Sequence, residues 1–533
     1  MKNKSIIFVL SITFFLISSM AILKYLSLHS GFYDLGIFFS HFYNIANRGQ
    51  LWRLFYGHSQ PLMLLYAAVY RIIPEYLSAI AVLIFQAFFI VLPGYWLQKR
   101  FGWLPFLAFV LYFPIWYNAL FDFHMDHLAV PLLFWFYFLV EDERYWLAIF
   151  PGVLLALVKE PFALQTAACG IFLLLKAYRS HWAGGHLPNY LSYLPGILLF
   201  LFGCSYFYAV VNFIFPALTG NRGGLDSSAF GWMGSGIKNM LIFIVFHPVV
   251  IIKEIFGMPG KIFYLLVLFG SLGFISILKP LYLIPALPIL GISLLSRLDN
   301  HYSIGHHYTA GLIAPMIMAF VMGLAVFKKF CEKFGLKKNG VNFVLCAIFL
   351  LSHILLSPSP LSQMFWRNKV WSDGWQAYIP TKRNKMIKEA IKKYIPADPN
   401  VVVSTQNSLN WSYLAHRKYY FCFPTGVTEP AKVPDFSNKG LKQFLKYITN
   451  HKLQTPNYKL IYADYVLLDL KRLWFIKDMG CNKWKDGQCY DQTFSKKFLN
   501  LIKETKKKYS LIYEKDGFMI FHRLVSKKTS VFN

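Results

Sequence analysis

Charged and imidazole side chains gather in short polar segments between long apolar runs, where acid–base or phosphate chemistry is possible. The first segment contains Tyr33 and Asp34, which follow the apolar run 5–28, and His58 lies later in the same loop. A carboxylate near an acceptor hydroxyl can act as a general base, and we predict this role for Asp34. The alternative is structural, because Asp is also a favoured N-cap residue for a following helix.

The second segment, 121–127, brings carboxylates and imidazoles close together between two apolar runs. It contains Asp122, His124, Asp126 and His127. Such a group could bind a divalent cation through Asp122 and Asp126, or hold a phosphate through His124. A solvated turn is the alternative, although bulky apolar neighbours make plain solvation less favourable.

The third segment is Lys159-Glu160-Pro161, which interrupts an otherwise apolar stretch from 145 to 175. Lys159 could bind a lipid phosphate as a point charge. Pro161 suits the first turn of a new helix. The alternative is a surface turn in which Lys159 and Glu160 neutralise each other.

The fourth segment, 300–308, is rich in His and Tyr and includes His306, His307 and Tyr308. Such a loop could bind phosphate or a metal ion, but its spacing matches no standard zinc motif. All four segments are predicted to lie on the same face of the membrane. They therefore suggest one polar cavity at that surface, rimmed by aromatic side chains.

The elements that position these residues are predicted to be membrane spans. The chain has 533 residues, of which 56% are hydrophobic and only 15% are charged. Apolar runs of about 17 residues or more can cross the hydrocarbon layer. We predict a mostly α, polytopic bundle of eleven spans, at about 5–28, 76–98, 103–120, 127–140, 145–158, 161–177, 190–215, 261–278, 280–297, 308–327 and 341–357.

Charge asymmetry orients this bundle. Lys2 and Lys4 precede the first span, so the N-terminus is predicted to be cytoplasmic and the first span to be retained. The four polar segments and the C-terminal region then lie outside the cytoplasm. The short apolar segment 59–73 is predicted to be re-entrant or interfacial, because a full span there would fit the charges less well. The stretch Ile37 to Trp52 is aromatic and amphipathic, which suits an interfacial helix.

Residues 358–533 are predicted to form a second, soluble α/β domain after the transmembrane domain 1–357. Helical stretches at Lys385–Tyr394 and Gly440–Thr449 alternate with strand-like runs at Val401–Ser404 and Tyr465–Leu470.

The C-terminal region is strongly basic and contains two cysteines in a polar loop. Residues 361–533 hold 31 Lys or Arg and 13 Asp or Glu. On a membrane protein this charge favours anionic lipid or an acidic acceptor, or a solvated face. We predict no nucleic-acid partner, because no nucleic-acid motif is visible. A disulfide between Cys481 and Cys489 is an open alternative in an extracytoplasmic loop.

Several motifs in combination resemble one family. They are YDLGIF (Tyr33–Phe38), YGHSQP (Tyr56–Pro61), FDFHMDHLAVPLL (Phe121–Leu133), LVKEPFAL (Leu157–Leu164), HYSIGHHYTAGLIAP (His301–Pro315) and ADYVLLDL (Ala463–Leu470). The chain is similar to the predicted membrane proteins called domain of unknown function twenty-seventy-nine. That family in turn resembles the GT-C glycosyltransferase superfamily, so the resemblance implies a GT-C-like bundle in a bacterial inner membrane.

The resemblance also implies an activity. Characterised GT-C enzymes move a sugar from a polyprenyl-phosphate donor to a lipid, protein or glycan outside the cytoplasm. Asp34 matches the acidic position after their first span, and Asp122 or Asp126 matches a second acidic position. Lys159 fits a recurrent Lys-containing break between spans. Gly57 stands where the family pattern has Asp, which weakens a metal site there and leaves His58 as the polar group.

The sequence therefore predicts a lipid-sugar-dependent glycosyltransferase with Asp34 as base. Lys159, His124, His306, His58 and Tyr33 would bind the donor and its phosphate, with a divalent metal as an open alternative. Glu160, His307 and Tyr308 would border this site. The rival hypothesis is a transporter, a flippase or an envelope scaffold on the same fold. Internal repeats or mid-membrane ionisable groups would favour a transporter, and the sequence shows neither.

Overall fold

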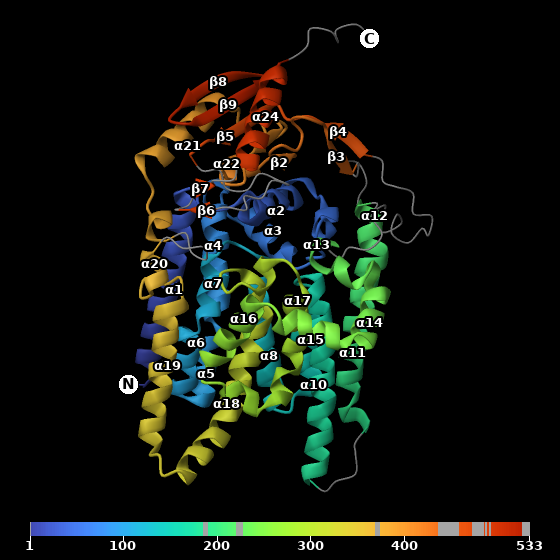
Figure 1. The fold of residues 1–533 in the computed structure, drawn as a ribbon, viewed down its shortest axis with the longest axis vertical. Coiled ribbons are helices and arrows are strands. Elements are labelled where there is room, and N and C mark those ends of the chain that lie inside the picture. Colours follow the sequence, from blue (N-terminus) through green and yellow to red (C-terminus); the bar gives the residue numbers. More distant parts are fainter. Residues whose placement is uncertain are drawn as a thin grey trace.

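The structure is a computed structural model that describes residues 2–184, 190–219, 227–367, 374–434, 458–471, 484–485, 488–489 and 492–524. Most of these residues are helical, as predicted, and a small sheet lies near the C-terminus (Figure 1). The helices form a bundle whose long members run along the vertical axis of Figure 1, and the sheet covers one end of it.

The bundle is built from apolar helices that precede the C-terminal region. They are α1 (Lys2–Leu26), α2 (Ile37–Arg48), α3 (Met63–Ile72), α4 (Glu75–Val91), α5 (Pro93–Phe101), α6 (Trp103–Leu111), α7 (Phe113–Leu120), α8 (Ala129–Glu141), α9 (Tyr145–Ala156), α10 (Glu160–Gly184), α11 (Leu194–Ala209), α12 (Phe215–Thr219), α13 (Ser227–Phe230), α14 (Gly236–Phe246), α15 (Pro248–Phe256), α16 (Pro259–Gly270), α17 (Leu287–Leu295), α18 (Ala310–Lys333) and α19 (Lys338–Leu356). Large apolar side chains remain exposed on many of them, as expected for surfaces that face lipid.

Within the described part of the chain, six helical segments are long and apolar enough to cross a membrane, or eight if each of two bent pairs counts as one span. The chain is therefore membrane-embedded, but the predicted count of eleven is not confirmed. Predicted spans at 127–140, 145–158, 261–278 and 280–297 correspond to shorter helices. The segment 59–73 contains only the ten-residue helix α3.

Prolines begin the second helix of each bent pair. The bend between α6 and α7 is 45°, and the bend between α14 and α15 is 91°. Pro114 and Pro248 lie in the first turn of α7 and α15, where a missing backbone N–H removes no helical hydrogen bond. The first of these bends delivers the end of α7 to the polar segment 121–127.

The C-terminal region contains a mixed five-stranded sheet, which agrees with the predicted α/β character. Its strands are β1 (Val403–Thr405), β2 (Tyr420–Cys422), β5 (Tyr465–Asp469), β8 (Tyr509–Lys515) and β9 (Phe518–Arg523), in the order β2-β1-β5-β9-β8. Strand β1 is parallel to β2 and β5, whereas β9 is antiparallel to β5 and β8. The pairs β3 (Ala431–Pro434) with β4 (Tyr458–Ile461), and β6 (Trp484–Lys485) with β7 (Gln488–Cys489), form separate two-stranded ladders.

Alternate residues of the sheet face two different cores. Leu467 and Ile520 belong to the core that continues into the helix bundle, whereas Val466 and Phe521 belong to the core on the other side. The second core also contains Phe498 of α24 (Gln492–Lys508). This alternation follows from the period of two along a strand, and it makes the sheet a layer between bundle and solvent-side helix.

Helix α21 (Lys382–Tyr394) joins the sheet to the end of the first span. Asn384 and Lys388 donate hydrogen bonds of 2.8 and 2.6 Å to the carbonyls of Ser27, just after α1, and of Leu26, its last residue. These carbonyls have no helical donor, so the side chains satisfy them. On the sheet side, Arg383 holds Asp469 through two hydrogen bonds of 2.8 and 2.7 Å.

The other α-helices that the structure describes in this region are short: α20 (Gln363–Trp366) and α22 (Ser412–Ala415). The predicted helix Gly440–Thr449 lies outside the described residues, and so do Cys481 and the side chain of Cys489. The predicted stretch Ile37 to Trp52 does contain a helix, α2, and its place at the membrane interface stays a prediction. The division into domains 1–357 and 358–533 and the side of the membrane that each end faces stay predictions.

Candidate functional site

A cavity of about 1180 Å³ lies between the sheet and the end of the bundle that it covers. All four polar segments contribute to its lining, together with α2 and residues 407–433 of the C-terminal region. Helix packing therefore brings together residues that are up to about 400 positions apart, as the predicted single polar cavity requires.

Asp34 projects from a break in the helical path. It lies within a π-helical turn, Phe32–Gly36, but its own φ of −104° and ψ of −108° are not helical. Gly31 permits the approach of the carboxylate, because a Cβ at Gly31 would lie 2.7 Å from Asp34 Oδ2 and 3.3 Å from Asn407 Oδ1. Asp34 is 24% exposed and lines the cavity, so a substrate can reach it.

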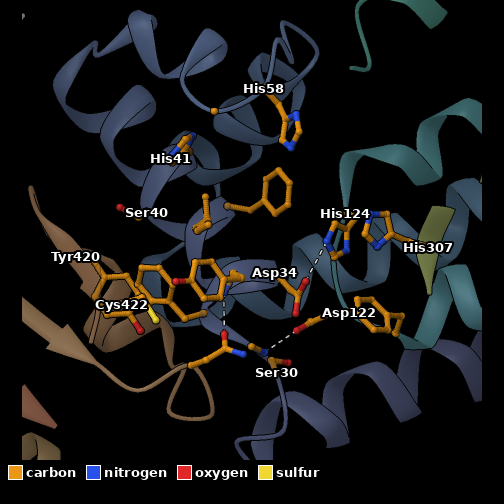
Figure 2. A pocket seen from close by; sticks show the side chains of 18 of the residues that line it. Ser30, Asp34, Ser40, His41, His58, Asp122, His124, His307, Tyr420 and Cys422 are labelled. Carbon is orange, nitrogen blue, oxygen red and sulfur yellow. Dashed lines mark hydrogen bonds and ion pairs between the residues drawn. The ribbon is translucent and has the colours of Figure 1, made fainter. Parts of the chain in front are cut away.

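His124 and His307 stand beside this carboxylate (Figure 2). Nε2 of His124 lies 3.1 Å from Asp34 Oδ1. The His124 ring stacks on His307 with centroids 3.5 Å apart and an interplanar angle of 13°. Stacking fixes the plane of His124, so its N–H can hold the Asp34 carboxylate in one orientation.

Asp122 approaches the same turn from the second polar segment, 121–127. Its Oδ2 accepts a hydrogen bond of 2.8 Å from the Gly31 N–H, and its Oδ1 accepts one of 2.9 Å from Phe123. Burial, and then the charge of Asp34, raise the pKa of Asp122 to about 7 against the opposing charge of Lys24. A protonated Asp122 would relieve the repulsion between these two carboxyl groups.

Asp126 and Lys159 form a buried ion pair at the wall of the cavity. Lys159 Nζ lies 3.5 Å from Asp126 Oδ2, and the side chains are 10% and 6% exposed. Burial lowers the pKa of Lys159, but the charges of Asp126 and Glu160 raise it, and the net direction is upward. Lys159 lines the cavity and stays cationic there, which is what a phosphate site requires.

Glu160 pairs with His58 rather than with Lys159. Its Oε1 lies 2.7 Å from His58 Nδ1, and its Oε2 accepts a hydrogen bond of 3.0 Å from the Ser59 N–H. His58 is 52% exposed and lines the cavity. Glu160 thus anchors the loop that presents His58.

The other predicted residues also lie at the cavity. Tyr33, His306 and Tyr308 line it, and Tyr308 packs against His307 with ring centroids 4.3 Å apart. Burial lowers the pKa of His306 to about 4 against the opposing charge of Asp34. Neutral His306 can therefore offer a hydrogen bond to a ligand without carrying a charge.

Asp122 and Asp126 point to different partners, backbone N–H groups for the former and Lys159 for the latter. Among the described residues, no three His, Cys, Asp or Glu side chains are grouped as a metal site. The divalent-cation site that the sequence predicted at Asp122 and Asp126 therefore stays a prediction.

Two further residues were missed by the sequence analysis. Lys24, near the end of α1, donates hydrogen bonds of 3.1 and 2.5 Å to the carbonyls of Leu120 and Phe121 and lines the cavity. A lone lysine in an otherwise apolar span could have indicated this site residue.

Asn407 is the second residue. Its side-chain Oδ1 accepts a hydrogen bond of 3.0 Å from the Tyr33 N–H, and its backbone carbonyl accepts one of 2.9 Å from the Phe32 N–H. No sequence signal links positions so far apart.

We predict that Asn407→Ala loosens the turn that carries Asp34. The Tyr33 N–H would lose its buried acceptor, at a cost of about 1–3 kcal/mol. If Asp34 takes part in a reaction, the turnover number of that reaction should fall about tenfold or more. The affinity for the ligand should change much less. Steady-state kinetics that separate kcat from KM measure this difference.

Asn400→Ala is the matched control, because Asn400 lies on an exposed turn of the same region and bonds only to Asp398 among the described residues. It should leave turnover unchanged. If the Asn407 and Asn400 variants have the same kcat and KM, Asn407 does not position the turn that carries Asp34.

Comparison with known proteins identifies the family. The chain matches the family described as predicted membrane protein (DUF2079) over residues 24–520. No curated protein and no solved structure matches the chain. The matched range contains every predicted site residue and the C-terminal sheet up to the middle of β9. The chain therefore belongs to the DUF2079 family of predicted membrane proteins, as its motifs predicted.

Proposed function

We propose that this protein is an integral-membrane glycosyltransferase that moves a sugar from a polyprenyl-phosphate donor to an acceptor outside the cytoplasm. The observation that carries the proposal is that Asp34 and Lys159 line one cavity from separate parts of the chain. The first supplies a carboxylate for proton transfer, and the second supplies a fixed cation for a phosphate.

The chemistry assigns each group one task. An acceptor hydroxyl attacks the anomeric carbon of the donor sugar, and its proton passes to Asp34. The bond between the anomeric carbon and the phosphate oxygen breaks, and polyprenyl phosphate leaves with the electron pair. Lys159 stabilises the charge that grows on the departing phosphate, and His124 holds the Asp34 carboxylate toward the acceptor.

The lining of the cavity suits such substrates. Aromatic side chains in it offer flat apolar surfaces against which sugar rings can pack, among them Tyr56, Tyr117, Phe121, Tyr308, Tyr378 and Tyr420. The polyprenyl chain would remain in the bilayer beside the bundle. The proposed setting is a bacterial inner membrane with the cavity on the outer side.

The test is donor binding and turnover by the purified protein in lipid nanodiscs. The probes are polyprenyl-phosphate-linked hexoses and pentoses, with polyprenyl phosphate alone and free sugars as controls. We expect saturable binding of one lipid-linked sugar, and release of polyprenyl phosphate when acceptors are supplied.

Two results would contradict the proposal. Absence of binding to every lipid-linked sugar by folded protein would remove the donor site. Movement of the intact lipid across the bilayer without cleavage of its sugar–phosphate bond would establish a flippase instead.

A further inference from the structure

His41 and Arg53 line the cavity but take no part in the proposed transfer. His41 belongs to α2, and Arg53 belongs to the short 3-10 helix Leu51–Phe55 that follows it. Each residue is only 7% exposed. Two buried polar groups that face a cavity need partners, and the cavity is where a partner can be supplied.

Arg53 is a buried cation whose hydrogen-bond acceptors are neutral. Its Nε donates to Gln50 Oε1 at 2.7 Å, and its Nη2 donates to the Lys418 carbonyl at 3.0 Å. Its guanidinium lies 4.9 Å from the centre of the Trp52 ring. Burial lowers the pKa of Arg53 to about 10, so it stays charged at neutral pH. No carboxylate forms an ion pair with Arg53 in the part of the chain that the structure describes.

His41 leaves one ring nitrogen unused. Its Nδ1 is buried and has no hydrogen-bond partner within the described ranges. Burial, and then the charge of Arg53, lower the pKa of His41 to about 3, so the ring is neutral. Depending on which nitrogen carries the proton, Nδ1 can donate to a ligand oxygen or accept a ligand hydroxyl.

The charge of the cavity favours an anionic occupant. The Lys and Arg side chains in its described lining are Lys24, Arg53, Lys159 and Lys432, whereas the acidic ones are Asp34 and Asp122. Lys159 already faces Asp126, and Lys24 caps the end of α7. Because the proposed function assigns Lys159 to the donor phosphate, Arg53 is the buried cation of this lining that is left for a second anionic group.

His41 lies away from His124 and His307, which flank Asp34 in the proposed transfer site (Figure 2). His41 follows Asp34 by seven residues, which corresponds to about 10 Å of rise along a helix. In Figure 2, His41 lies to the left of Asp34, whereas His124 and His307 lie to its right. A ligand held at His41 would therefore approach Asp34 from a different direction than a group beside these histidines.

We propose that Arg53 and His41 bind a negatively charged sugar, whose phosphate or carboxylate pairs with Arg53 and whose neighbouring polar atom meets His41. Tyr56 and Tyr419, which also line the cavity, border this subsite. One part of this proposal rests on the proposed function. If the protein is a glycosyltransferase, the charged sugar bound here is its acceptor, and the acceptor is therefore acidic.

The experiment measures binding without any donor, by calorimetry on the full-length protein in nanodiscs. The probes are glucose 6-phosphate, glucuronic acid and glucose, which differ in their charged group. We expect at least one charged hexose to bind saturably and glucose to bind more weakly. The tighter of the two charged probes identifies phosphate or carboxylate as the preferred group.

Arg53→Gln should weaken the charged probe by about tenfold or more, since it removes a charge-assisted hydrogen bond. Arg48→Gln is the matched control, because Arg48 ends helix α2, which carries His41, but is not in the cavity lining. This variant should bind the probe as the wild type does. Because Arg53 also supports the Lys418 carbonyl, His41→Asn provides a second variant that leaves the hydrogen bonds of the Arg53 guanidinium to Gln50 and Lys418 in place. It should also weaken binding.

Equal binding by wild type, Arg53→Gln and His41→Asn would overturn the subsite, whatever the transfer assay gives. Binding that depends on Arg53 and His41 in a protein without transferase activity would leave the subsite standing and remove the glycosyltransferase function. The two proposals therefore fail by different measurements.

Discussion

Asp34→Asn is expected to lower the rate of sugar transfer by about 100-fold or more while the protein stays folded. General-base catalysis contributes about 10²–10⁴-fold, and an amide cannot take up the acceptor proton. The size of the side chain is kept, and its carbonyl oxygen can still accept a hydrogen bond from His124, which lies 3.1 Å from the carboxylate. Donor binding should therefore persist, and only turnover should fall.

The control for this variant is Asp142→Asn at the other end of the bundle. Asp142 follows α8, which starts near the cavity, and it pairs with Arg100 on an exposed surface. Surface ion pairs of this kind contribute about 0–1 kcal/mol, so both stability and transfer should be retained. Normal transfer by the Asp34 variant would refute the role of Asp34 as base.

Lys159→Met is expected to produce the largest loss of stability, about 3–5 kcal/mol, together with loss of donor binding. The substitution leaves Asp126, which is only 6% exposed, as a buried carboxylate without its lysine. Breaking a buried ion pair on one side costs this much because the remaining charge is uncompensated. Unfolding in graded denaturant, followed by donor titration under folding conditions, measures the two effects.

A double variant separates these two effects. Asp126→Asn combined with Lys159→Met removes both charges, so most of the stability should return, whereas the donor phosphate should still find no cation. Lys176→Met is the matched control, because Lys176 pairs with Glu141 at 2.8 Å and does not line the cavity. It should cost stability and leave donor affinity unchanged. Recovery of donor binding in the double variant would show that Lys159 is structural.

The sequence predicted the local features of this molecule well, because they depend on local patterns. Apolar runs predicted the helices, the amphipathic stretch predicted α2, and the strand-like runs predicted β1 and β5. Polar residues between apolar runs cost free energy unless they have a use, so they indicated Asp34, His124 and Lys159 as cavity residues. The structure places all three in the lining.

The number of spans and the distant contacts could not be predicted in the same way. Helices such as α9 and α16 are shorter than a membrane crossing, and their role depends on packing rather than on composition. Arg53 resembles any other charged residue of a loop until folding buries it without a carboxylate. Asn407 acquires its role only when the C-terminal region docks on the Tyr33 turn.

The docking of Asn407 has a consequence for how the protein is made. The turn that carries Asp34 emerges early in synthesis, but the residue that fixes it is made more than 370 positions later. While the first helices insert, the Tyr33 N–H therefore lacks this partner, and the hydrogen bond can form only after residue 407 has been made. A chain that ended before residue 407 would also lack the wall that residues 407–433 contribute to the cavity, so this cavity is complete only late in synthesis.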